Sequence, residues 1–74
     1  MKHYSEIIAT NPEIRFGKPC IRGMGILVYD ILSWLAADMS AAEILRDYPK
    51  LTDEDIIATL SYTADKEYKI SVAS

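Results

Sequence analysis

Two hexapeptides of this chain follow one pattern, and that pattern marks where helices begin. MSAAEI at residues 39–44 and LTDEDI at residues 51–56 each read apolar residue, hydroxyl, two variable residues, acid and isoleucine. The hydroxyl of Ser40 or Thr52 can accept a main-chain N–H bond, and Glu43 or Asp55, three residues later, can accept the N–H of the cap residue. The sequence therefore predicts two capped helices, starting near residues 41 and 53.

The segment between the two caps is short and contains a proline. Pro49 in YPKL has no N–H to continue a helix, so we expect the first capped helix to end near Tyr48. Two short helices joined by such a turn are typical of a helix-turn-helix arrangement. Loss of either cap hydroxyl is expected to cost about 1 kcal/mol of stability.

Apolar periodicity places a further helix ahead of this pair. It starts at Val28, and Asp38 stands where a helix often ends in a left-handed residue. We expect the last helix to run from 53 to about 67, with Ile56, Leu60 and Ala64 on one buried stripe. The predicted core of the head is Val28, Ile31, Leu32, Leu35, Ile44, Leu45, Tyr48, Ile56 and Leu60.

The first third of the chain is interrupted by proline and glycine, which excludes a long helix there. CIR at 20–22 and ILV at 26–28 predict a small hairpin across a glycine-bearing loop, and EIIA at 6–9 predicts another short strand. The expected fold class is mainly α: a three-helix, helix-turn-helix-like head at 28–68, a short N-terminal β-hairpin arm at 1–27 and a tail at 69–74. These parts form a single predicted domain.

The size of the chain bears on its oligomeric state. A chain of 74 residues buries only about 60% of the surface that its unfolded form exposes, so we expect a homodimer. Half of the residues are hydrophobic and 26% are charged, which is the composition of a globular protein. The sequence has no apolar run long enough for a membrane span and no signal-peptide core, so the expected location is cytoplasmic.

Catalytic chemistry has few side chains to draw on here. The chain has one histidine, His3, and one cysteine, which we expect to be a buried apolar residue. The acids at 53–55 match the preference of a first helical turn for negative charge. We therefore predict no enzyme, no catalytic residue, no metal site and no cofactor.

Charge is distributed unevenly and limits nucleic-acid binding. Residues 1–29 hold four basic and two acidic side chains, whereas residues 30–74 hold four basic and nine acidic ones. The candidate nucleic-acid contacts are Arg15, Lys18 and Arg22 in the arm. Alternatively, these cations pair with the acidic helices or bind the carbonyls of the hairpin. The acidic start of the last helix is unsuited to a polyanion.

Other side chains suit contact with a protein. Tyr29, Trp34 and Tyr62 fall off the core stripes, and exposed aromatic residues often anchor interfaces. Lys66 and Lys69 could reach the carboxylates of a metal-dependent nuclease. The alternative for the aromatic residues is a second packing face, within the small core or in a homodimer.

Two stretches resemble the domain-of-unknown-function family four hundred and thirty-three. GKPCIRGMGI at 17–26 is similar to the family pattern GKPxIRGTRI, and DMSAAEILRDYPKLTDEDI at 38–56 is similar to GMSxEEIL followed by DYPxLTxEDI. The resemblance covers about 11–62. The departures are Met24 and Gly25, where the family usually has Thr and Arg, and Asp38, where it usually has Gly.

The resemblance implies a helix-turn-helix type fold and a role as the antitoxin of a toxin–antitoxin pair, because members are often encoded beside PIN-like nucleases. We therefore predict a non-catalytic regulatory protein, acting as an antitoxin by contact with a PIN-like nuclease. One alternative is a DNA-binding transcriptional repressor that uses the basic arm. Another is an orphan homodimer.

Overall fold

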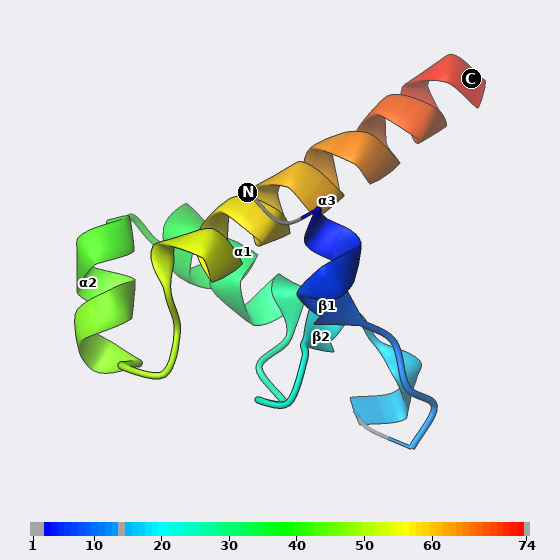
Figure 1. Ribbon diagram of the computed structural model, residues 1–74. Helices are drawn as coiled ribbons and strands as arrows, with labels where there is room; N and C mark the ends of the chain where they lie inside the picture. Colours follow the sequence, from blue (N-terminus) through cyan, green and yellow to red (C-terminus); the bar gives the residue numbers. More distant parts are fainter. Residues whose placement is uncertain (1–2, 14, 74) are drawn as a thin grey trace.

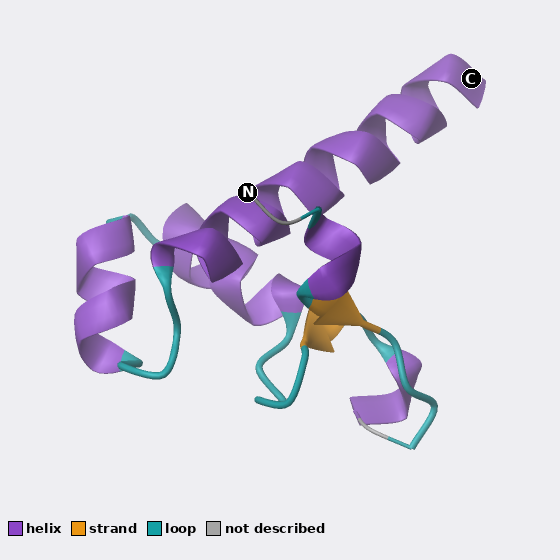
Figure 2. Cartoon of the chain, viewed as in Figure 1, coloured by secondary structure: helices purple, strands orange, loops and turns teal. Residues whose placement is uncertain are grey.

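The computed structural model describes residues 3–13 and 15–73, and for residues 15 and 67–73 it describes the main chain alone. The chain is mainly α-helical with a short N-terminal hairpin, as predicted (Figures 1 and 2). The elements in order are η1 (Tyr4–Glu6), β1 (Ile8–Ala9), η2 (Arg15–Gly17), β2 (Cys20–Ile21), α1 (Val28–Ala36), α2 (Ala41–Asp47) and α3 (Asp53–Ala73).

The strand pairing of the hairpin differs from the one predicted for CIR and ILV. β1 pairs antiparallel with β2, with Ile8 opposite Ile21, so the strand predicted in EIIA is present. ILV contributes a single bridge between Leu27 and Cys20. The physical reason is that Val28 already belongs to α1: the Leu27 N–H is bonded to the Asp30 carboxylate at 3.0 Å, and the helix begins at the next residue.

Both capping boxes form as the sequence predicts. Ser40 Oγ accepts the Glu43 N–H at 3.1 Å, and Glu43 Oε1 accepts the Ser40 N–H at 3.0 Å. Thr52 Oγ1 accepts the Asp55 N–H at 3.2 Å, and Asp55 Oδ2 accepts the Thr52 N–H at 2.9 Å. α2 and α3 therefore begin at the predicted residues, and Asp38 ahead of α2 has the expected left-handed φ of 73°.

The core lies where the three helices meet the hairpin. Its residues from the helical part are Val28, Ile31, Ile44, Leu51, Ile56 and Ala58, and those from the arm are Ile7, Ile8 and Ile21. Ile31 and Ile44 are fully buried. α1 is the central element, because it contacts β2, α2 and α3.

The predicted stripe of α3 is wrong beyond Ile56. Leu60 is 47% exposed and Ala64 is also exposed, whereas Thr59 is fully buried. Thr59 can be buried because its hydroxyl donates to the Asp55 carbonyl at 3.0 Å, which satisfies its polar group inside the helix. The predicted core residue Tyr48 is also at the surface, 37% exposed.

α3 is longer than predicted, because its main chain stays helical to Ala73 and includes most of the predicted tail. Its C-terminal part extends away from the other elements (Figure 1). The radius of gyration is accordingly 12.5 Å, against about 11 Å for a compact domain of this length. None of the helices in the described part of the chain combines the length and the hydropathy of a membrane span.

Candidate functional site

An open, largely apolar groove of about 430 Å³ lies between the start of α1, the middle of α3 and the segment that leads into β2. Its apolar surface comes from Pro19, Val28 and Leu32, and its aromatic surface from Tyr29 and Tyr62. Val28 is only 5% exposed, while Tyr29 is 71% exposed. The groove therefore has a fixed apolar floor and an aromatic side chain that stands in solvent.

One main-chain hydrogen bond and one aromatic contact hold the walls of this groove in place. The Val28 N–H donates to the Pro19 carbonyl at 3.0 Å, which fixes the start of α1 against the segment before β2. On the other wall, the Tyr62 ring packs edge-on against the Tyr4 ring, with centroids 5.5 Å apart. The N-terminal turn η1 thereby supports the part of α3 that faces the groove.

Two lysines flank the groove. Lys18 and Lys66 line it and are exposed, and Lys66 Nζ lies 5.3 Å from the centroid of the Tyr62 ring. No carboxylate is among the described side chains that line the groove. The mouth of the groove is thus a basic site on a chain whose net charge is −3.

The structure separates the three predicted nucleic-acid contacts. Lys18 lies at the groove. Arg22 instead donates to the main-chain carbonyls of Ser5 and Glu6, each at 3.3 Å. The predicted alternative is binding to the carbonyls of the hairpin, and these two carbonyls belong to η1, just before it. The main chain of Arg15 is in η2, but its side chain lies outside the described residues.

Three of the five predicted partner contacts meet at the groove: Tyr29, Tyr62 and Lys66. Trp34 does not line it. Its ring stacks on Tyr48, with centroids 4.2 Å apart and planes at 12°, and so joins α1 to the end of α2. The side chain of Lys69 lies outside the described residues.

Grouping and burial decide whether side chains in the described part of the chain could hold a metal ion or act as a nucleophile. Within residues 3–13 and 15–66, His, Cys, Asp and Glu side chains form no group of three that could hold a metal ion. Cys20 is 4% exposed, as expected of a buried apolar residue, and its thiol lies 3.6 Å from the Ala9 carbonyl oxygen. In the first turn of α3, the Asp55 carboxylate belongs to the helix cap.

Sequence reasoning missed the groove as a site. The sequence predicts Val28 and Leu32 only as core residues and predicts no role for Pro19 and Thr63, yet all four line the groove. Their spacing gives no signal, because Val28 and Leu32 meet Thr63, more than thirty positions further on, only when α3 packs across α1.

The family model described as "Protein of unknown function (DUF433)" matches residues 8–63 of this chain. The chain belongs to the DUF433 family. A crystal structure of a DUF433 member protein from Anabaena variabilis ATCC 29413 superimposes with a TM-score of 0.79 at 27% identity, covering 90% of this chain and 66% of that one. The uncharacterized protein y4eO of Sinorhizobium fredii is 37% identical over 51 residues.

Both relatives are longer than this chain. The aligned region is 69% of this chain but 23% of y4eO, so the chain spans about a quarter of that curated relative. The DUF433 match contains most of the groove and ends before Lys66. Lys66 therefore lies beyond the part of this chain that the family model describes.

Proposed function

We propose that this DUF433 protein is a non-catalytic binding protein, the antitoxin of a toxin–antitoxin pair whose toxin is a PIN-like nuclease. The observation that carries the proposal is the open apolar groove in which Tyr29 is 71% exposed. Large aromatic side chains over an apolar floor are typical anchors of protein interfaces. The kind of partner is taken from the family resemblance.

The charge at the start of α3 favours a protein partner over DNA. In a helix-turn-helix protein the first residues of the second helix enter the major groove. In this chain those residues are Asp53, Glu54 and Asp55, and carboxylates repel the phosphate backbone. The same acids suit the basic nucleic-acid face of a nuclease, where complementary charge speeds association.

The proposed mechanism is occlusion of the nuclease. The groove anchors the partner, and Asp53 and Glu54 at the start of α3 cover the surface on which the nuclease binds its substrate. No chemical step is needed, because the complex excludes nucleic acid by occupying its place. A nuclease so covered loses activity in proportion to the amount of complex.

The test is titration of this protein into the purified PIN-like nuclease that the proposal takes as its toxin, with RNA cleavage as the readout. We expect inhibition that is complete near one equivalent. Tyr29→Ala combined with Leu32→Asp should abolish it, whereas the matched control Leu60→Ser, on the outer face of α3, should inhibit fully. A tight complex that leaves cleavage unchanged would contradict occlusion, and absence of any complex would contradict the antitoxin role.

A DNA-binding repressor is the second candidate function, and exposed Lys18 is the feature that favours it. Binding through the arm should weaken steeply as salt rises, because released counterions drive it. Retardation of the upstream DNA that disappears in the Arg15→Ala, Lys18→Ala, Arg22→Ala variant would favour this candidate. Unchanged retardation in that variant would exclude the arm.

A further inference from the structure

We propose that the groove binds an acidic, apolar segment of the partner: a short stretch with one or two large hydrophobic side chains flanked by carboxylates. This inference rests on the proposed function, because it takes the partner to be a protein. It adds the chemistry of the segment that the partner inserts. That chemistry follows from the shape of the groove, from the charges at its mouth and from the faces of α3.

The shape of the groove suits a chain segment. Its volume of about 430 Å³ lies within the range of roughly 300–1,000 Å³ usual for binding pockets. Unlike an enclosed cavity, it is open to solvent. The buried side chain of Val28, the half-buried Leu32 and the ring of Pro19 offer the incoming hydrophobic side chains an apolar surface.

The charges at the groove favour carboxylates beside the hydrophobic side chains of the segment. Lys18 comes from the arm and Lys66 from α3, so two cations approach the groove from separate elements. Among the described side chains, Asp30 and Asp65 adjoin groove residues in the sequence, and each carboxylate accepts a hydrogen bond within the chain: Asp30 from the Leu27 N–H and Asp65 from the Tyr4 hydroxyl. An occupant that brings its own carboxylates therefore complements the two lysines.

A second copy of this chain is the competing occupant, and the geometry disfavours it. The acidic start of α3 is followed by the exposed residues Ile57 and Leu60, which resemble the proposed segment. At 100° per residue, however, these two lie on the side of α3 opposite Tyr62 and Lys66. Copies joined in this way would meet head to tail, which gives a ring or an open chain instead of a two-fold dimer.

The experiment uses the full chain labelled with nitrogen-15 and two synthetic fourteen-residue helical peptides. One peptide has leucine on one face and glutamate on the other, and the second has lysine in place of every glutamate. We expect the glutamate peptide to bind about tenfold more tightly at low salt, as two rim ion pairs would give. Amide signals of Val28, Leu32 and Thr63 should shift on binding.

Charge reversal makes the test specific. The Lys18→Glu, Lys66→Glu double variant should prefer the lysine peptide, and both lysines are exposed, so this variant is expected to fold. The matched control is Lys50→Glu, which changes an exposed lysine between α2 and α3 and should leave the peptide preference unchanged. Far-ultraviolet circular dichroism of each variant establishes that the fold is retained.

Three results would overturn the inference. The first is an unchanged glutamate preference in the double variant. The second is a set of shifts confined to the smaller hollow of about 230 Å³, which is lined by Ile26, Asp47, Tyr48, Pro49 and Lys50. The third is self-association without any peptide, measured by sedimentation equilibrium and accompanied by a change at the Thr63 amide in the NMR spectrum. That result would assign the groove to a second copy.

The outcome is separable from that of the proposed function. If neither peptide binds but the nuclease is inhibited at one equivalent, the antitoxin proposal stands and the acidic-segment inference fails. If the glutamate peptide binds with the expected charge dependence while no nuclease is inhibited, the groove chemistry stands and the antitoxin proposal fails.

Discussion

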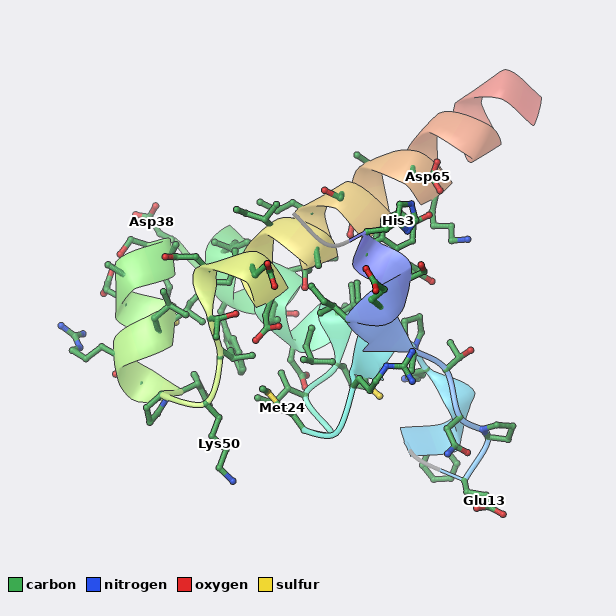
Figure 3. The ribbon with its side chains drawn as sticks, viewed as in Figure 1. His3, Glu13, Met24, Asp38, Lys50 and Asp65 are labelled. Carbon is green, nitrogen blue, oxygen red and sulfur yellow. The ribbon has the colours of Figure 1, made fainter. Side chains whose placement is uncertain are left out.

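The Tyr4 hydroxyl donates a hydrogen bond to the Asp65 carboxylate and ties the N-terminal turn η1 to the middle of α3, 61 residues away. The Tyr4 ring also meets the Tyr62 ring edge-on. Figure 3 labels Asp65 in α3 and His3, the residue that precedes η1. One wall of the groove is therefore supported by the first residues of the chain, far from it in the sequence.

The tie between Tyr4 and Asp65 predicts a pH-dependent loss of stability. The hydrogen bond to the Asp65 carboxylate is the main cause that raises the pKa of Tyr4 above its usual range. The bond is therefore fully present below the unfolded pKa of about 10 and is lost as pH rises through the raised folded pKa. We expect Tyr4→Phe to lower the Tm by a few degrees at pH 7.

This difference in Tm between the wild type and Tyr4→Phe should shrink as the pH is raised above the pKa of free tyrosine. Thermal denaturation of both proteins between pH 7 and strongly alkaline pH measures it. A difference that is constant over the whole range would show that the hydroxyl contributes nothing through this bond.

The first capping box predicts a loss of stability in acid. The N–H of Ser40 bonded to the Glu43 carboxylate is the main cause that lowers the pKa of Glu43. Its contribution is present above the unfolded pKa and is lost as pH falls through the lowered folded pKa. Glu43→Gln should lower the stability of the protein towards urea at pH 7. The variant and the wild type should be equally stable at a pH low enough to protonate Glu43 in both the folded and the unfolded wild type.

The hydroxyl of the same box has a contribution that does not titrate. Ser40 Oγ accepts the Glu43 N–H, so Ser40→Ala leaves one donor of the first turn of α2 without its cap. We expect a loss of about 1 kcal/mol in the free energy of unfolding. Ser40→Asp should restore most of it, and equal stability of the alanine variant and the wild type would contradict the role of the cap.

Burial predicts different losses in the free energy of unfolding at two aliphatic positions. Ile44 is fully buried, so Ile44→Val should cost about 1 kcal/mol by removing one methylene from the core. Leu60 is 47% exposed, so Leu60→Ser should change the free energy of unfolding by no more than about 0.5 kcal/mol. Urea denaturation of both variants distinguishes the structure from a core that contains Leu60.

The stack of Trp34 on Tyr48 provides a fluorescence test. Trp34 is the only tryptophan of the chain, and its ring lies parallel to that of Tyr48 at a centroid distance of 4.2 Å. We expect Tyr48→Ala to cost about 1 kcal/mol and to shift the emission of Trp34 to longer wavelength, because its face becomes exposed to water. Unchanged emission would place Trp34 away from Tyr48.

Local chemistry in the sequence determined where the helices start. A cap needs only a hydroxyl, a main-chain N–H and an acid three residues on, and Ser40, Glu43, Thr52 and Asp55 form these bonds. The left-handed Asp38 and the motif of the DUF433 family are likewise properties of short segments. Each could be predicted because no distant residue takes part.

Tertiary packing decided which face of α3 is buried, how the hairpin pairs and where the groove lies. A hydropathy pattern treats Leu60 as core and Thr59 as surface, but the packed helix satisfies the Thr59 hydroxyl with its own carbonyl and leaves Leu60 outside. The groove needs Pro19, Val28 and Tyr62 side by side. Burial and contact depend on partners far away in the sequence, so only the folded chain determines them.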